Sequence, residues 1–426
     1  MVFMRPRISS DFEAITLCPP GDYIFPNLKK LRWSPKPGVS FHHTRLFLSP
    51  RLSDLIIGSI DAVADLCVLT NLAAKCPSLT KVAIHIHTQS LRSLAIPGIS
   101  AAVSRLTRFQ FINVPGLDEA ALAHVAHLPD LRSLELRSQA PSTFTSPTTD
   151  KSAAFPGLTH LELPTMENAT SLLTTVGKCS LVELTIPVPG DLLKAAIAGR
   201  FYSALAKHCS HSSLRKLSVV GPRRVPVAAL AAIPPDELHI YTVRGDILNP
   251  LYSFANLESV WLSDPTGFDL DNGTVMAMAR ARPHIASLSL GAGATEHGPS
   301  RVTLEALYAF AKWCPRLRRL EMTLNAIVVP KVRINGKKRA SQRTLRTLNV
   351  AGSAITKPQR VAKFPSAIFP ELESIGTLYE ELEEQWANED EDEEEVVIEG
   401  DLFDYNELWK EAEDALFSFE IWYAHL

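Results

Sequence analysis

The chain has 426 residues, 46% of them hydrophobic, and its 43 basic and 46 acidic residues leave a formal net charge of −3. It contains no run of 18 apolar residues, which argues against a membrane-spanning helix. The opening MVFMRPRISSDFEA lacks the apolar core of a secretory signal peptide. We therefore expect an intracellular protein, located in the cytoplasm, the nucleus or both, with no membrane partner.

Residues 1–24 are expected to form an N-terminal lead or cap, and residues 25–378 one repeat array. In the array a phrase recurs about every 27 residues: an apolar residue, often followed by Pro, and then L-x-x-L-x-L. It reads FPNLKKLRW at 25–33, CPSLTKVAI at 76–84 and FPELESIGT at 369–377. A period of this length is the signature of a solenoid, and this phrase predicts leucine-rich repeats.

The first leucine of each phrase defines an anchor position, and fourteen anchors can be placed. The third residue after the anchor is apolar or aromatic at all fourteen, and the fifth is apolar at all but one, where Thr377 stands. Residues two apart lie on the same face of a strand, so these two positions are predicted to point into the solenoid. The anchors are Leu28, Leu52, Leu79, Leu106, Leu131, Leu158, Leu181, Leu214, Leu238, Leu257, Ile285, Leu317, Leu345 and Leu372.

Stacking one strand per repeat predicts an α/β fold, a leucine-rich repeat solenoid in the form of a horseshoe with a parallel concave sheet. The chain between strands has room for helices, which would form the convex side. Helical patterns occupy residues 117–127, 191–208 and 304–313, and Asp118 is a candidate N-cap. The Ser-, Thr- and Pro-rich segment 139–154 predicts a protruding loop.

Six cysteines raise the question of zinc or disulfides, but the chain has no C-x-x-C pair. Four of them lie shortly before an anchor: Cys76 and Cys314 three residues before, Cys179 two and Cys209 five. In other repeats phenylalanine is the third residue before the anchor, which we call the minus-three position. These cysteines are therefore predicted to be small buried residues. We therefore expect no metal site and no cofactor.

Charge is segregated along the chain. Residues 380–426 carry nineteen acidic side chains and one basic, whereas residues 312–346 carry eleven basic and one acidic. Residues 379–400 are expected to form an acidic, mobile segment, and residues 401–426 an aromatic helix that caps the last repeat. Two interpretations of the acidic segment stay open: a solvated tail that aids solubility, or a mask over the basic repeats.

The sequence carries no P-loop, no Rossmann glycine pattern, no H-E-x-x-H and no G-x-S-x-G, so we predict a protein that is not an enzyme. In a solenoid the exposed side of the strands is the expected binding surface, reached by the second and fourth residues after each anchor. Acidic residues such as Glu135 and Glu162 share these positions. The candidate protein-binding residues of the concave face are Lys30, Arg32, Lys81, His85, Arg108, Lys216, Trp261 and Arg319.

We expect protein partners on this face. An outward aromatic side chain such as Trp261 is typical of an interface anchor. The basic bias of the first repeats is too weak to predict a nucleic-acid partner.

The stretch FPNLKKLRWSPKPGVSFHHTRLFLSPRLSDLIIG at 25–58 resembles the first repeats of fungal, basidiomycete-type F-box proteins with leucine-rich repeats. The phrases LAAKCPSLTKVAI and FAKWCPRLRRLEM resemble their cysteine-containing repeat subclass, and the resemblance covers residues 25–378. It implies an F-box-like substrate-recognition protein of a cullin-type ubiquitin ligase pathway, with the ligase adaptor as a further partner. Residues 1–24 lack the Leu-Pro opening of an F-box, so the F-box itself is not seen.

Two other functions stay open. One is a stand-alone leucine-rich repeat scaffold or inhibitor with no link to a ligase. The other is a regulator of a small GTPase, because leucine-rich repeat proteins that activate the nuclear-transport GTPase also end in an acidic block. Those proteins carry an Asn-containing repeat, which this chain mostly lacks.

Overall fold

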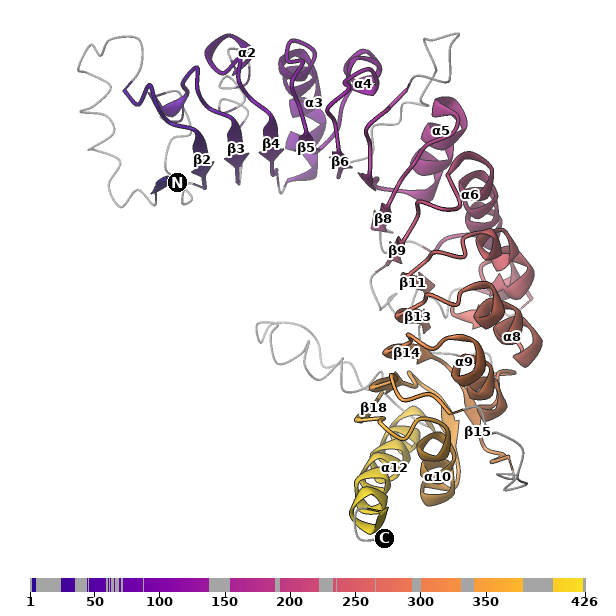
Figure 1. The fold of residues 1–426 in the computed structure, drawn as a ribbon. Coiled ribbons are helices and arrows are strands. Elements are labelled where there is room, and N and C mark those ends of the chain that lie inside the picture. The colour runs from indigo at the N-terminus through magenta and orange to yellow at the C-terminus, as the bar shows by residue number, and fades with distance from the viewer. Residues whose placement is uncertain are drawn as a thin grey trace. The chain divides into compact units, whose positions relative to one another are not determined.

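The computed structural model divides into two compact units (Figure 1). Unit 1 comprises Met1–Ile186 and His208–Ser210, and unit 2 comprises Pro187–Lys207 and His211–Leu426. The structure describes residues 2–4, 24–34, 44, 46–58, 60, 62, 65, 69, 72–86, 88–137, 154–187, 192–221, 233–234, 236–264, 266–292, 300–330, 341–377 and 401–423.

Unit 1 is a parallel sheet in which each strand pairs with the next one along the chain. Its helices lie on one side of that sheet (Figure 1). The strands are β1 (Val2–Met4), β2 (Lys30–Trp33), β3 (Asp54–Ile57), β4 (Lys81–Ile84), β5 (Phe111–Val114), β6 (Ser133–Leu136), β7 (His160–Glu162) and β8 (Glu183–Pro187). The helices are α2 (Leu72–Lys75), α3 (Gln89–Val103), α4 (Glu119–Ala126) and α5 (Met166–Val176).

Unit 2 repeats the plan, with parallel strands on one side and helices on the other (Figure 1). Its main strands are β9 (Lys216–Val220), β11 (Ser259–Asp264), β13 (Ser287–Ala292), β14 (Arg319–Met322), β16 (Thr347–Asn349) and β18 (Ser374–Gly376). Its helices are α6 (Ala195–His208), α8 (Asn272–Ala281), α9 (Leu307–Trp313), α10 (Pro358–Ile368) and α12 (Asp401–Tyr423), with 3-10 turns η4 (Leu238–Ile240), η5 (Gly245–Ser253) and η6 (Leu304–Ala306). Two short parallel pairs join β10 (Val243–Arg244) to β12 (Phe268–Asp269) and β15 (Asn325–Ala326) to β17 (Ala354–Ile355).

The backbone carbonyl directly after an anchor sets the register between repeats. Lys29 O accepts hydrogen bonds from both Ser53 N (2.9 Å) and Asp54 N (3.1 Å) of the next repeat. The same two-donor arrangement recurs through both units. It fixes each strand two residues after its anchor, so the third and fifth positions after the anchor are buried from strand to strand.

The core of each unit consists of the anchors and the third and fifth residues after them, which stack from one repeat to the next in columns. On β2, Leu31 and Trp33 are buried while Lys30 and Arg32 are exposed. Burying one such apolar side chain contributes about 1.5–3 kcal/mol, so the repeated columns hold the array together. The predicted α/β leucine-rich repeat solenoid, with inward-pointing third and fifth positions, is confirmed.

Two predicted anchors were wrong. β5 begins at Phe111 and pairs with Lys81, which places the anchor at Phe109, three residues beyond Leu106. Leu106 and Phe109 are both buried and three apart, so the sequence allows either register. The predicted anchor Leu238 starts the 3-10 turn η4 instead of preceding a strand.

No repeat strand intervenes near Leu238, because β9 pairs directly with β11. Arg215 O accepts hydrogen bonds from Glu258 N and Ser259 N, as the carbonyl after any anchor does toward the next repeat. The chain between these two strands is therefore one long connection and not a repeat of its own.

The three predicted helices are confirmed. The patterns at 117–127, 191–208 and 304–313 correspond to α4, to α6, and to η6 followed by α9. Asp118 is the N-cap of α4 as predicted, accepting a hydrogen bond from Ala121 N at 2.8 Å. The predicted loop at 139–154 lies outside the described residues except for its last residue. The acidic segment 379–400 lies outside them entirely.

Both ends of the array carry structure beyond the repeats. β1 adds a parallel strand to β2 from within the predicted N-terminal lead. At the other end α12 contacts α10, β17 and β18. Trp409 Nε1 donates to Ser353 O at 2.8 Å, and Ile375 N of β18 donates to Glu413 Oε1 at 2.9 Å. Helix α12 therefore supplies a polar partner to the last strand.

The minus-three position forms a second buried column before most anchors, with Phe25, Lys178 and His211 as exposed exceptions. In many repeats its carbonyl accepts the anchor's N–H, as Cys76 O does from Leu79 N (3.2 Å). Cys76 and Cys314 are fully buried there, as predicted. Cys179 and Cys209 are buried too, but they face each other across a bridge between adjacent repeats.

Candidate functional site

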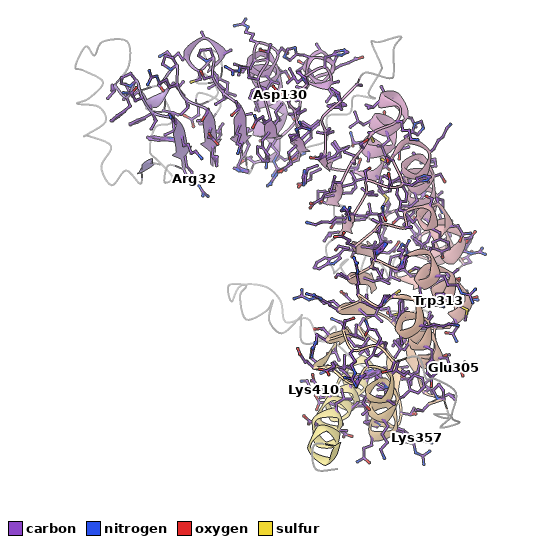
Figure 2. The ribbon with its side chains drawn as sticks, in the orientation of Figure 1. Arg32, Asp130, Glu305, Trp313, Lys357 and Lys410 are labelled. Atoms are coloured by element: carbon purple, nitrogen blue, oxygen red, sulfur yellow. The ribbon has the colours of Figure 1, made fainter. Side chains whose placement is uncertain are left out.

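The sheet face of each unit consists of the second and fourth residues after each anchor. These side chains point away from the core because the residues between them are buried. Figure 2 shows Arg32 on this side of unit 1, and Glu305, Trp313 and Lys357 on the helix side of unit 2. The sheet face presents side chains from successive strands in register, which suits a surface that contacts a partner over several repeats.

The first strands of unit 1 bring together three of the predicted basic residues. Lys30 and Arg32 are exposed on β2, and Lys81 is exposed on β4. Lys30, Asp54 and Lys81 are register neighbours, and Lys81 Nζ lies 4.0 Å from Asp54 Oδ1. His85 follows β4 directly and is half-buried. This end of the sheet face is basic, with one carboxylate inside it.

Arg108 does not belong to the sheet face. The predicted site included it because the anchor was placed at Leu106. With the anchor at Phe109, Arg108 is an exposed residue before β5, and the outward positions on that strand belong to Phe111 and Asn113. Asn113 occupies an outward strand position that the sequence-based site missed, although neighbouring side chains leave it only 5% exposed. The alternation around Phe109 was the signal that could have found it.

The later strands of unit 1 form an acidic row. Asn113, Glu135 and Glu162 are register neighbours on β5, β6 and β7, and Asn113 Nδ2 donates to Glu135. Arg137 lies 3.7 Å from Glu135 and 4.0 Å from Glu162. Burial raises the pKa of Glu135, and repulsion from Glu162 adds to the rise against the attraction of Arg137. The sheet face of unit 1 is thus basic over β2–β4 and acidic over β6–β7.

The sheet face of unit 2 centres on Trp261. Its side chain is 40% exposed on β11, and its register neighbours are Ser218 on β9 and Ser289 on β13. Trp261 Nε1 donates to Ser287 Oγ at 3.2 Å. Small neighbours leave the indole standing above the strands, while the hydrogen bond fixes its orientation. A large ring held in this way is suited to anchoring a partner.

Lys216 and Arg319 flank the Trp261 strand in the neighbouring row. Lys216, Ser259, Ser287 and Arg319 are successive register partners on β9, β11, β13 and β14. Both basic residues are exposed. With strands about 4.8 Å apart, they lie roughly 14 Å from each other across two serines. The structure therefore brings the three predicted residues of unit 2 onto one face.

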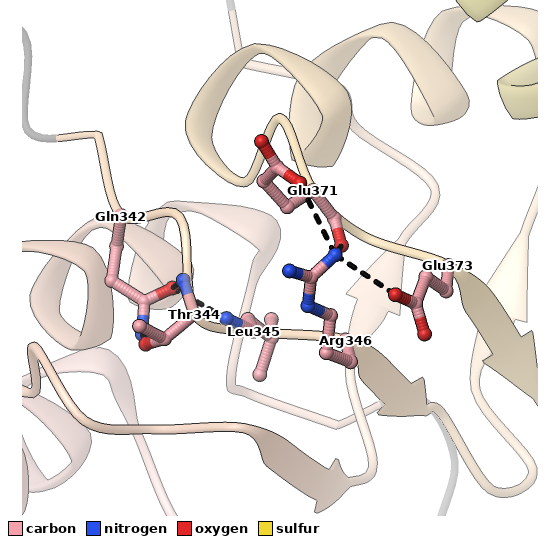
Figure 3. Close-up of polar contacts among 6 residues, drawn as sticks. All are labelled: Gln342, Thr344, Leu345, Arg346, Glu371 and Glu373. Carbon is pink, nitrogen blue, oxygen red and sulfur yellow. Dashed lines mark hydrogen bonds and ion pairs between the residues drawn. The ribbon is translucent and has the colours of Figure 1, made fainter.

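Part of the predicted basic segment 312–346 is engaged in contacts within the fold. Arg346 Nη1 lies 3.2 Å from Glu371 Oε2 and 2.8 Å from Glu373 Oε1 (Figure 3). Lys312 lies over the ring of Trp313 at 4.8 Å from its centroid. Residues 331–340 of the segment lie outside the described residues.

In the part of the chain that the structure describes, no three His, Cys, Asp or Glu side chains are grouped as metal ligands. No helix among the described residues is long and apolar enough to cross a membrane.

Comparisons with known proteins add little beyond the fold. No protein-family model and no curated protein matches the chain. Among solved structures, the leucine-rich repeat-containing protein LegL7 from Legionella pneumophila is 15% identical, with a TM-score of 0.29, and the match covers 82% of this chain and 90% of that one. The yeast Rad7 and Elc1 complex gives 16% identity and a TM-score of 0.35, covering 82% and 75%. The leucine-rich repeat solenoid therefore rests on the strands, anchors and register of this chain and not on these matches.

Proposed function

We propose that the chain is a non-enzymatic protein-binding solenoid whose partners contact the sheet faces. The observation that carries this proposal is the ordered row of outward side chains on consecutive strands. In unit 1 the row changes from basic to acidic, and in unit 2 an oriented Trp261 stands between Lys216 and Arg319. A patterned face of this kind discriminates between partners by charge and supplies an aromatic anchor.

The finer proposal is an F-box-like substrate-recognition role in a cullin-type ubiquitin ligase pathway, with the sheet face binding the substrate. Its support is the resemblance of residues 25–378 to fungal F-box proteins with leucine-rich repeats. A stand-alone scaffold or inhibitor is the main alternative, because the same face serves either role. We also propose that the protein acts inside the cell.

Affinity capture of the tagged chain from its own cell extract, followed by mass spectrometry, tests the proposal. Arg32→Glu and Trp261→Ala alter the two sheet faces, and Glu305→Lys and Lys357→Glu are controls on the helix side. We expect the sheet-face variants to lose captured partners that the controls retain. Loss of an aromatic anchor typically weakens binding by about 30-fold or more.

The identity of the captured proteins separates the alternatives. A cullin adaptor among them supports the ligase pathway, whereas partners without any ligase subunit support a scaffold or inhibitor. Stimulation of a small GTPase by the purified chain would instead favour a regulator of that GTPase. Equal capture by all four variants would contradict the sheet face as the binding surface.

A further inference from the structure

Two thiols from adjacent repeats lie side by side in unit 1. The Sγ atoms of Cys179 and Cys209 are 3.3 Å apart, and the two residues are only 7% and 1% exposed. Both are free thiols here. Thirty residues of chain separate them, so the fold and not the local sequence brings them together.

The backbone holds this pair in a geometry that a disulfide can adopt. Cys179 and Cys209 form a parallel bridge, in which Cys179 N donates to His208 O and Ser210 N donates to Cys179 O, each at 2.8 Å. Bridge partners in a sheet have Cα atoms about 4.8–5.5 Å apart. This lies within the Cα separation of about 4.4–6.8 Å found across disulfides. Closing the bond therefore needs side-chain movement rather than a new backbone arrangement.

The two sulfurs are chemically unequal. The hydrogen bond between the two sulfurs, in which either atom can be the donor, lowers the pKa of Cys179 and raises that of Cys209. The other described cysteines lack such a neighbour, and burial raises the pKa of Cys76 to about 11 and of Cys314 to about 12. Cys179 is thus the thiol of this set that ionises most readily, and the thiolate is the reactive form.

Solvent lies close to Cys179. The residues on either side of it, Lys178 and Ser180, are exposed. A small oxidant therefore has a short path to the sulfur, whereas Cys76 and Cys314 are fully buried in the minus-three column.

We propose that Cys179 and Cys209 form a reversible dithiol–disulfide site that a small hydroperoxide, such as hydrogen peroxide, oxidises. The Cys179 thiolate attacks one peroxide oxygen, the O–O bond breaks, and the departing hydroxide takes a proton to become water. The resulting sulfenic acid is attacked by the Cys209 sulfur. The S–O bond then breaks, and the Cys209 proton leaves with the hydroxide as a second water. The thiol pair loses two electrons and the peroxide gains them.

The bond would join Cys179 to the short segment between α6 and β9. It would close a loop that contains α6. The site is independent of what the sheet faces bind, so its test stands apart from the capture experiment.

The experiment treats the full-length chain with a small excess of hydrogen peroxide, blocks remaining thiols with an alkylating agent and maps peptides by mass spectrometry without reduction. We expect a peptide pair linked through Cys179 and Cys209 that disappears after dithiothreitol. Peptides that contain Cys76 and Cys314 should be recovered with these cysteines alkylated after the protein is unfolded and digested. The oxidised chain should also melt several degrees higher than the reduced chain.

Variants identify the order of steps. Cys209→Ser should give no linked pair and should leave a sulfenic acid on Cys179 that dimedone traps, and Cys179→Ser should give neither product. Cys76→Ser serves as the matched control and should form the link as the parent does. The wild-type peptide map stands even if a variant fails to fold. Full alkylation of both cysteines after peroxide treatment, or their oxidation only in links to other cysteines, would overturn the proposal.

Discussion

Two polar side chains in the minus-three column, Gln342 and Arg282, differ in how far their polar groups are hydrogen-bonded. Gln342 Oε1 accepts from Leu345 N at 2.9 Å (Figure 3). Its Nε2 donates to Leu317 O at 2.7 Å, so both ends of the amide are hydrogen-bonded. Arg282 occupies the same position before Ile285 and is 2% exposed, yet its Nε and Nη1 have no hydrogen-bond partner. Its guanidinium lies 5.5 Å from the centroid of the Tyr252 ring. Burial lowers the pKa of Arg282 to about 10.

A buried charge with two nitrogens that lack hydrogen-bond partners costs stability, so removing it should help. We expect Arg282→Met to raise the free energy of unfolding by about 1–3 kcal/mol, because the apolar side chain needs no partner. Gln342→Met is the matched control and should lower it by about 1–3 kcal/mol, since it strands buried backbone groups. Urea denaturation of both variants gives the comparison. Destabilisation of the same size in both would show that Arg282 has a partner in solution.

Asp264 is a second residue whose ionisation the fold opposes. It is buried at the end of β11, and its Oδ1 accepts from Thr266 N and Oγ1 at 2.9 Å each. Burial raises the pKa of Asp264 to about 7 from 3.8, although the Thr266 hydrogen bonds act to lower it. A carboxyl group whose pKa is higher in the folded state binds its proton more tightly there. Stability should therefore fall as the pH rises from about 4 to about 7.

Asp264→Asn keeps an oxygen for Thr266 and removes the charge. We expect the variant to match the parent near pH 4 and to exceed its free energy of unfolding by on the order of 2–4 kcal/mol at pH 8. Asp271→Asn is the control: Asp271 is exposed and caps α8, and hydrogen bonds from Thr274 lower its pKa. That substitution should bring no gain at high pH. Denaturation curves at several pH values test both, and a gain for Asp264→Asn that does not vary with pH would contradict the titration.

At the scale of elements, α12 closes the end of unit 2. Its buried residues Trp409, Ala412 and Leu416 are spaced three and four apart, which defines one apolar face of a helix. β18 pairs only with β16 among the described strands, and Glu413 accepts the hydrogen bond from its Ile375 amide. We propose that α12 is the cap that the last repeat needs, because an open array end exposes both core and strand edge.

Trp409→Ala tests the cap. The substitution removes a side chain that is 1% exposed and its hydrogen bond to Ser353 O, and we expect it to lower the free energy of unfolding by about 3–5 kcal/mol. Amide hydrogen exchange of Ile375 should become faster. Glu407→Ala on the exposed side of the same helix is the control and should change stability by less than about 0.5 kcal/mol. Unchanged exchange at Ile375 in Trp409→Ala would argue against the cap.

At the scale of the whole molecule, the open question is whether the acidic segment covers the basic repeats. If residues 380–395 mask basic repeats, their deletion should increase binding of an anionic probe such as heparin at low salt. The increase should vanish near 1 M salt, where the screening length falls to about 3 Å. Fluorescence anisotropy of a labelled probe measures both conditions. Equal binding by the full chain and the deletion would leave the segment as a solvated tail.

The sequence alone determined the repeat, its class and the inward positions. Residues such as Leu31 and Trp33 recur two apart after an anchor, and apolar side chains at that spacing have to share the buried face of a strand. The N-cap Asp118 and the buried Cys76 followed from equally local patterns. The basic residues of β2 and β4 were also correctly placed on the outward face.

The tertiary structure decided what depends on pairing between repeats. Leu106 and Phe109 are both apolar and three apart, so only the pairing of β5 with β4 selected the anchor and removed Arg108 from the sheet face. Leu238 fits the phrase locally, but β9 pairs with β11 and leaves it no strand. The contact of Cys179 with Cys209 arises between residues thirty apart, at a distance where sequence spacing carries no information on contact. Hydrogen bonds across the sheet, rather than local preference, settled each of these cases.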